Sequence, residues 1–462
     1  MAGVVLQGVS KFITNVIIGR IGGPVVLGTV ASGISTAQLL SLLWPTSTGS
    51  AASKFVARAR GEQAFDEASA VAAHLGKRTL QTTLILAGAA IPAWMTLNRG
   101  DVAGGLCVAI LVMGYSGYSF TRGLAFGSAQ IARATKWDLV TSTLGITGVL
   151  VSLQFNARGL VLLLPLASAS LIFTAACWPW KAHGQLRPKH RREMDIFVAL
   201  ATAGTLASAG FLQLSMIAAR LADGREGAGQ YAAALALATP LSIVAGSLSL
   251  VLYPSMSEAF GRGDNAGIRR QTDQATRFLA VVMVAGVGSV ALCSRLVIFL
   301  IWGTRYEEAG TLLPILLLAI LATTLGVPSV NSLTSQKQTG MLITTFASVL
   351  GLAVGVATWL ATVPSFGVVG IAIGYLTCAV TIAGMAFVLA WRRGRQHWIG
   401  LVARIGAAVA ALVALLAVQD MLNLNHWLDP VFAGAFSVSW YAVSRIDARE
   451  SVALFTQRLR RN

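Results

Sequence analysis

Residues 309–327 read AGTLLPILLLAILATTLGV, a run without a single charged side chain. A helix of about 20 apolar residues crosses the hydrocarbon core of a bilayer, so this run predicts a membrane span. The rest of the 462-residue chain has the same character, with 55% hydrophobic residues, 11% charged residues and a mean hydropathy of +0.70. This number of apolar residues is enough for roughly 12 to 14 spans and leaves few residues for other domains. The composition therefore excludes a soluble enzyme, a secreted disulfide-rich domain and a disordered chain.

Apolar windows of similar length recur along the whole chain. We therefore expect an all-α polytopic membrane protein with about 14 transmembrane helices. No basic region precedes the first window and no small-residue cleavage site follows it, so we expect this span to be retained and not removed as a signal peptide. The predicted spans are residues 4–21, 25–44, 79–97, 102–120, 139–155, 160–178, 196–221, 230–252, 278–301, 309–327, 341–363, 367–389, 399–418 and 428–443.

The first two blocks of six spans echo each other at an offset of about 200 residues. Arg20 and Gly28 flank a glycine-containing turn before span 2, and Arg220 and Gly229 flank one before span 8. Six spans return the chain to its starting side, so we expect two parallel lobes with a substrate site between them near the bilayer midplane. Further echoes pair Thr135 with Thr339 and Gly159 with Gly367.

These echoes divide the chain into three parts. We predict an N-terminal six-helix lobe over residues 1–194, a C-terminal six-helix lobe over residues 195–390, and two additional helices with a basic tail over residues 391–462. The lobes are expected to alternate in exposing the site to either side of the membrane.

The positive charge is distributed unevenly among the predicted loops. The net charge is +17, and the Lys and Arg residues divide about 27 to 7 between the even-numbered loops with the C-terminal tail and the odd-numbered loops. Because cytoplasmic loops carry the excess of basic residues, we place both termini in the cytoplasm and the protein in the inner (plasma) membrane. The surplus is a topology signal, and we expect no nucleic-acid partner.

Lys11 is a cation inside the first apolar run. A cation at the bilayer centre costs about 3 kcal/mol even on lenient insertion scales, so Lys11 should face water or an anion. Gln7 and Asn15 recur at helical spacing with Lys11, Ser10 and Thr14, which predicts one polar face lining a lumen. The alternative is that the span begins later, that Lys11 extends to the cytoplasmic surface, and that the polar stripe packs against a neighbour.

Three further polar residues are candidates for binding an anionic substrate. Arg220 and Gln213 are seven residues apart and share one face of span 7, and Arg295 lies toward the outer end of span 9. Guanidinium groups suit phosphate oxygens, so these arginines with Lys11 would form a cationic cavity for an anionic head group. The alternative for each arginine is an interfacial position with its charge at the membrane surface.

The chain lacks the usual signatures of other mechanisms. No Asp or Glu falls in the middle of an apolar run, which argues against cation-drug antiport through a membrane-embedded acid. The five histidines lack metal-ligand spacing, the four cysteines sit in separate apolar runs, and no phosphate loop or nucleophile elbow is present. We therefore predict a transporter with no catalytic residue, no metal and no cofactor.

Several stretches resemble the polysaccharide (lipid-linked oligosaccharide) flippase family of the multidrug/oligosaccharidyl-lipid/polysaccharide exporter superfamily. The resemblance covers roughly residues 1–390 and is carried by turn-forming glycines and prolines. The matching stretches are GRIGGP at residues 19–24 with Gly28 following, GQYAAA at 229–234, YPSMS at 253–257, WGTRY at 302–306 and VPSFGVVG at 363–370.

This resemblance implies two six-helix lobes around a V-shaped cavity with a positively charged lumen, a pattern that Lys11 fits. It also implies a polyprenyl-pyrophosphate-linked glycan as substrate, whose tail stays among the membrane lipids, with polysaccharide assembly proteins as further candidate partners. Spans 13 and 14 look like the extra pair of some members, such as peptidoglycan-precursor flippases, where they help to form a groove for the lipid tail. A multidrug or other small-molecule exporter on the same scaffold is the alternative, although this chain lacks the acid of the multidrug branch in spans 1 and 7.

Overall fold

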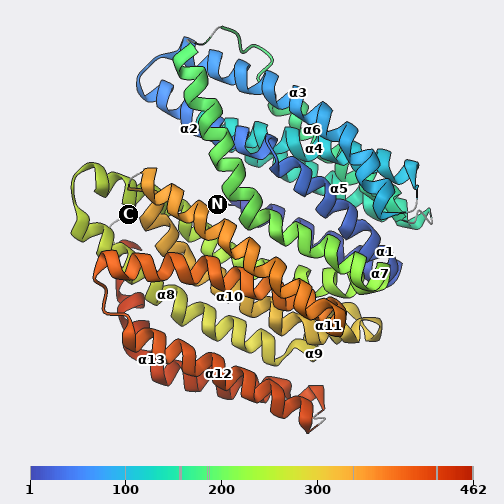
Figure 1. Ribbon diagram of the computed structural model, residues 1–462, viewed down its shortest axis with the longest axis vertical. Helices are drawn as coiled ribbons and strands as arrows, with labels where there is room; N and C mark the ends of the chain where they lie inside the picture. Colours follow the sequence, from blue (N-terminus) through green and yellow to red (C-terminus); the bar gives the residue numbers. More distant parts are fainter. Residues whose placement is uncertain are drawn as a thin grey trace. The chain divides into compact units, whose positions relative to one another are not determined.

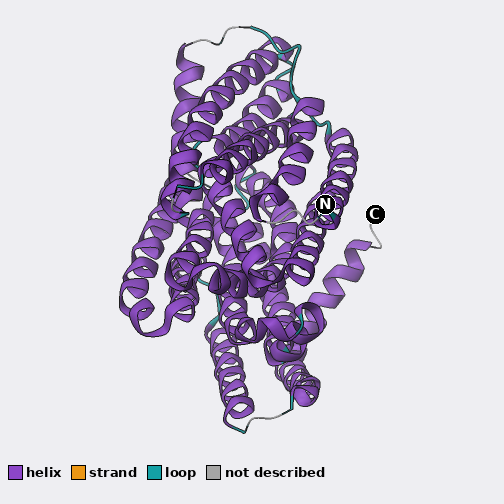
Figure 2. Cartoon of the chain, turned by 90° about the vertical axis from the view of Figure 1, so that its right-hand side faces the viewer, coloured by secondary structure: helices purple, strands orange, loops and turns teal. Residues whose placement is uncertain are grey.

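The computed structural model describes residues 2–98, 100–155, 159–184, 186, 188–336, 338–422 and 425–459. Within these ranges the side chains of residues 2–7, 188, 189, 250, 254, 261, 338, 446 and 448–459 are outside the description. The described chain consists of helices joined by short loops, without a strand (Figure 2). The predicted all-α class is therefore confirmed.

The chain forms two compact units, Met1–Ala232 and Ala233–Asn462, with the boundary inside one long helix. In the first unit α4 packs against α2, α3 and α6 (Figure 1). The three-part division at residues 194 and 390 stays a prediction. Elements of the first unit are α1 (Ala2–Leu42), α2 (Pro45–Gly61), α3 (Phe65–Leu97), α4 (Val102–Gly127), α5 (Ile131–Gln154), η1 (Gly159–Leu162), α6 (Leu163–Cys177) and the first part of α7 (Pro188–Gly261).

In the second unit α10 packs against α11 and α8, and α13 packs against α8. The elements after α7 are α8 (Asn265–Leu292), α9 (Ser294–Trp302), η2 (Thr304–Tyr306), α10 (Glu307–Thr334), α11 (Gln338–Gly394), α12 (Ile399–Met421), η3 (His426–Leu428) and α13 (Asp429–Leu459).

Nine helices of the described ranges are long and apolar enough to cross a membrane. Three of them, α1, α7 and α11, contain a residue with non-helical backbone angles and so comprise two segments each. Counting these segments separately and adding α5 and α13 reproduces the predicted number of about 14. The sequence prediction did not include α2 as a helix, because its short, mixed sequence does not form an apolar run.

Glycines make the breaks inside the merged helices. Gly23 has φ 77° and ψ −179°, and Gly224 has φ 70° and ψ −154°, angles that only glycine adopts without strain. Pro24 follows the first break and removes a backbone donor, so the helical ladder cannot continue through it. The two breaks are 201 positions apart and lie in the two turns that the sequence comparison paired. This agreement supports the predicted duplication.

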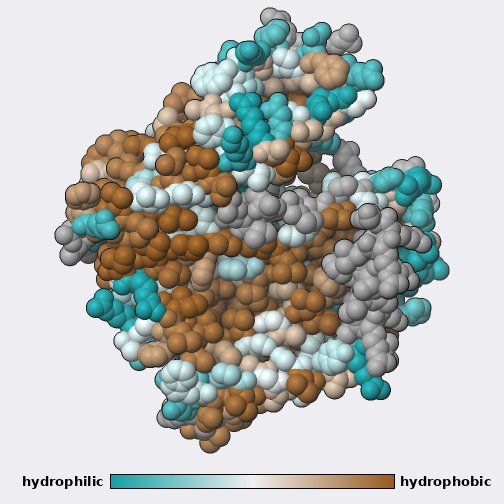
Figure 3. Space-filling view, turned by 180° about the vertical axis from the view of Figure 1, so that it is seen from behind, coloured by the Kyte–Doolittle hydropathy of each residue, from teal (hydrophilic) through white to brown (hydrophobic). Residues whose placement is uncertain are grey.

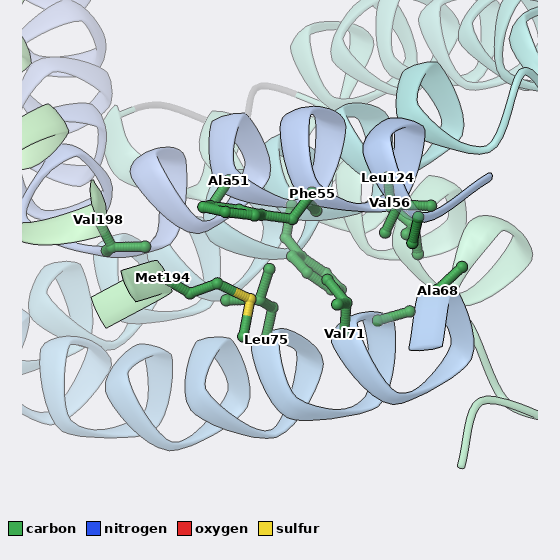
Figure 4. Packing of buried hydrophobic residues seen from close by; sticks show 13 residues of the cluster. Ala51, Phe55, Val56, Ala68, Val71, Leu75, Leu124, Met194 and Val198 are labelled. Carbon is green, nitrogen blue, oxygen red and sulfur yellow. The ribbon is translucent and has the colours of Figure 1, made fainter. Parts of the chain in front are cut away.

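Apolar side chains hold the helices of the first unit together. Phe55 and Val56 of α2 pack with Val71 and Leu75 of α3, and Met194 of α7 lies against the same cluster (Figure 4). Their burial and close packing fix the end of the unit at which α2, α3 and α7 meet.

The outside of the helices is also apolar. Leu360 is 76% exposed and Ile399 is 75% exposed, although both lie within long helices. Hydrophobic residues cover most of the face in Figure 3, and hydrophilic residues gather mainly toward its margins. Contiguous exposed apolar surface of this extent requires a lipid environment, so the chain is a multi-pass membrane protein.

Candidate functional site

Lys11 lies about two and a half turns into α1, and its side chain is exposed. Its Nζ atom is 5.9 Å from the centroid of the Tyr115 ring on α4, at the outer limit of a cation–π contact. Lys11 forms no ion pair with any described residue. The structure thus presents an accessible ammonium group, without a carboxylate partner, within a membrane helix.

A second group of polar side chains lies on α4, beyond Tyr115. Tyr118 donates a hydrogen bond of 2.7 Å to Asp138 of α5, and Arg122 approaches the same carboxylate at 3.6 Å. Asp138 is buried, so this pairing neutralises a charge that would otherwise be costly there. Tyr115, Tyr118 and Arg122 therefore form a polar ridge on α4 that begins at Lys11.

Arg220 is held by residues around the turn between α3 and α4. It is 7% exposed, donates a hydrogen bond to the Asn98 side chain, and lies 5.5 Å from the centroid of the Trp94 ring. The Trp94 indole in turn donates to Asp101 at 3.2 Å. The Nη1 atom of Arg220 has no hydrogen-bond partner among the described residues. Arg220 thus ties α7 to the end of α3.

Lys11 and Arg220 lie far apart along the axis of α4. Tyr115, which faces Lys11, is 14 positions after Asp101, which belongs to the group around Arg220. At 1.5 Å per residue this separation is about 20 Å along α4. The two cations therefore do not meet in one phosphate-sized site.

The other predicted polar residues are described mainly by their burial. Asn15 on α1 and Gln213 on α7 are half-buried. Gln7 lies in α1, but its side chain is outside the described residues. Thr14, which shares the predicted polar face, is buried and donates to the Ser10 carbonyl at 2.8 Å, so part of that face is satisfied within its own helix.

Arg295 belongs to the second unit, where it lies in the first turn of α9 and forms an ion pair with Asp420 of α12. It lines a cavity of about 650 Å³ together with Glu307, Asn425 and His426. A guanidinium already paired with a carboxylate is a weaker anion receptor than a free one, because the ligand must compete with the existing partner.

Residue-by-residue sequence reasoning missed the ridge on α4. Tyr115, Tyr118, Arg122 and Asp138 are not among the residues that the sequence predicted for the site. The available signal was the spacing of Tyr115, Tyr118 and Arg122, which are three and seven positions apart and so share one helix face. As for metals, the described residues contain no group of three or more His, Cys, Asp or Glu side chains that could hold an ion.

Comparison with protein families gives one match. The family model described as "Lipid II flippase MurJ" matches residues 146–443, which is more than half of the chain. No curated protein sequence gives a significant match.

Several solved structures have a similar fold. A lipid II flippase MurJ in an inward closed conformation has a TM-score of 0.70 at 12% identity, and the alignment covers 97% of this chain and 98% of that one. An inward-facing MATE multidrug resistance transporter of the MOP superfamily has a TM-score of 0.67 at 16% identity, covering 84% and 94%. A MOP superfamily transporter from Pyrococcus furiosus has a TM-score of 0.62 at 15% identity, covering 86% and 93%. These likenesses show the fold.

Proposed function

Because the chain belongs to the lipid II flippase MurJ family, we propose that it translocates a polyprenyl-diphosphate-linked oligosaccharide, a cell-envelope precursor, from the cytoplasmic to the outer leaflet by alternating access. The polysaccharide-flippase motifs in its turns are consistent with such a substrate. In this proposal the basic loops and both termini face the cytoplasm. The protein acts as a transporter and makes or breaks no covalent bond in its substrate.

The task is set by the chemistry of the substrate. A glycan and a diphosphate cannot enter hydrocarbon unaided, because their polar groups would lose water without replacement. A flippase must therefore supply hydrogen bonds and positive charge along a path through the membrane, while the polyprenyl chain remains in lipid. The proposed path needs at least one cation that is accessible and not neutralised by the protein.

Lys11 is the observation that carries this proposal. It is exposed, has no carboxylate partner among the described residues, and lies in a membrane helix. We assign it to the diphosphate, with Tyr115 beneath it and Arg122 further along α4. Asn15 and Gln213, both half-buried, are proposed as secondary polar contacts, and Gln7 is retained from its position on α1.

We propose that Arg220 and Arg295 contribute less to substrate binding than Lys11 does. Arg220 has one unpartnered nitrogen, and its other terminal nitrogen donates to Asn98 at the α3–α4 turn. Arg295 is paired with Asp420. We propose that each contacts substrate only in a conformation that releases its present partner. Because outward movement of each net negative charge gains about 2.3 kcal/mol per 100 mV of inside-negative potential, the substrate requires no coupled cation.

Reconstitution of the full chain in liposomes tests the proposed function. A fluorescent polyprenyl-diphosphate disaccharide placed in one leaflet should become accessible to an impermeant quencher faster than in protein-free liposomes. A cationic dye loaded into the same liposomes should show no protein-dependent efflux under a pH gradient. Dye efflux without glycolipid movement would contradict the proposal and favour the multidrug exporter.

A further inference from the structure

A pocket at the basic end of the first unit has no part in the proposed transport path. It encloses about 700 Å³ and is formed by α2, α3, the α4–α5 loop and the segment after α6. Three cations line it, Arg60, Arg133 and Lys181, and none of its lining residues is acidic. A pocket of this volume is large enough for a small-molecule head group.

Two of these cations are held in place by helix ends. Arg60 donates to the carbonyl of Gly127, the last residue of α4, at 3.2 Å. Arg133 donates to the carbonyl of Ala176, in the last turn of α6, at 2.7 Å. Carbonyls at helix C-termini lack intrahelical partners, so they fix each guanidinium. Arg133 also donates to the Gln130 side chain at 3.4 Å, and each guanidinium keeps further donors for a ligand.

Three neighbouring carboxylates contact other basic side chains. Glu62 pairs with Arg58, Glu67 pairs with His190, and Asp138 pairs with Arg122. In the described part of the chain, no ion pair includes any of the three pocket cations. The pocket therefore concentrates positive charge that the protein does not neutralise, which is the electrostatic condition for binding an anion.

Exposed aromatic residues indicate where this anion comes from. Trp180 is 75% exposed and Phe65 is 65% exposed, and both line the pocket. The Trp180 indole donates to the Ala175 carbonyl at 2.9 Å, so the ring is anchored at the end of α6. Aromatic rings at such positions sit at the level of lipid head groups. A free solute would not require an apolar rim.

We propose that this pocket binds the phosphate of an anionic glycerophospholipid of the cytoplasmic leaflet. The guanidinium donors of Arg60 and Arg133 contact the phosphate oxygens, and Lys181 adds a third charge. Trp180 and Phe65 contact the upper part of the acyl chains. The bound lipid joins α2, α3 and the ends of α4 and α6, and this site is independent of the proposed transport path.

Native mass spectrometry of the full chain in detergent tests the site, with dioleoylphosphatidylglycerol, dioleoylphosphatidylcholine and inorganic phosphate as probes. The wild-type protein should bind phosphatidylglycerol about a hundredfold more tightly than phosphatidylcholine, because the three basic contacts near the surface contribute about 1 kcal/mol each. Replacing all three cations (Arg60→Gln, Arg133→Gln and Lys181→Gln) should abolish this preference.

A matched variant with the same charge change controls for net charge. Lys77, Arg78 and Lys136 are exposed and lie outside the pocket, so their replacement by Gln should leave the preference intact. If the triple pocket variant does not fold, Lys181→Gln alone should weaken phosphatidylglycerol binding about fivefold.

Four results would overturn the proposal. One is a wild-type protein that does not distinguish the two lipids, and another is equal loss of binding in the pocket and control variants. The third is displacement of phosphatidylglycerol by millimolar inorganic phosphate, which would identify a site for a free anion. Displacement by the polyprenyl-diphosphate glycolipid but not by phosphate would also contradict the assignment, since it would make the pocket a substrate site.

Discussion

Lys11 combines two properties that rarely occur together at the residue scale, a charged side chain and a position inside an apolar membrane helix. Such residues are expensive to maintain and normally serve a pathway or a ligand. The aromatic ring of Tyr115 stabilises the ammonium group without neutralising it, so the charge remains available to a diphosphate.

Replacing Lys11 tests its proposed role directly. Lys11→Ala should slow glycolipid translocation by about tenfold or more, since a charged hydrogen bond contributes about 1.5–3 kcal/mol. Lys11→Arg should keep part of the activity and Lys11→Glu should abolish it, with membrane insertion unchanged in all three. The assay is leaflet exchange in proteoliposomes matched for protein content. Normal exchange by Lys11→Glu would remove Lys11 from the site.

Arg220 is expected to contribute more to stability than to substrate binding. Arg220→Ala should lower the free energy of unfolding by about 1–3 kcal/mol, because it removes the donor to Asn98 and the contact with Trp94. Asn98→Ala should reproduce part of this loss, whereas Arg225→Ala, an exposed neighbour, should not.

Thermal unfolding of the purified variants measures this difference. The direct-binding role would be favoured instead if Arg220→Ala unfolded at the wild-type temperature while losing translocation. In that case the unpartnered Nη1 atom would be the group that contacts substrate.

At the scale of elements, one tightly constrained contact lies between the two paired turns. A Cβ atom on Gly28 would be 2.0 Å from the carbonyl oxygen of Arg225, and one on Gly229 would be 2.1 Å from that of Pro24. Both obstacles are backbone atoms that cannot rotate away. The crossing of α1 and α7 therefore depends on the absence of a side chain at either position.

Gly28→Ala should consequently destabilise the first unit. The expected loss is about 1–3 kcal/mol in unfolding free energy, because overpacking forces the helices apart. Gly88→Ala is the matched control, since a Cβ there meets nothing within 4 Å. Its unfolding temperature should be unchanged or higher, as alanine is the better helix former. Equal effects of the two substitutions would show that the α1–α7 crossing is not tightly packed.

The number of spans and the positions of the helix breaks were largely predictable from the sequence. Hydrocarbon thickness sets the length of a span, and glycine marks where a helix breaks. The windows predicted about 14 spans, and the structure breaks α1 and α7 at Gly23 and Gly224, inside predicted turns. The rotation of each helix was not predictable, since helices that are apolar on all sides carry little directional signal. That rotation decides that Lys11 faces Tyr115 and that Arg220 faces Trp94.

For the whole molecule, fold and family agree. The helical architecture resembles both a MurJ flippase and MATE transporters, and the family model that matches is that of the flippases. The shared fold allows either class of substrate, so the chemistry of the path must decide between them. An accessible lysine and a buried carboxylate already paired with arginine favour an anionic substrate over a cationic one.

The most direct test of the proposed function is the leaflet distribution of lipid-linked glycan in cells depleted of this protein and lacking any other flippase. An impermeant glycan-reactive probe reports the outer leaflet, and extraction reports the total. The account predicts that depletion raises the total and lowers the fraction accessible to the probe. An unchanged accessible fraction would contradict it.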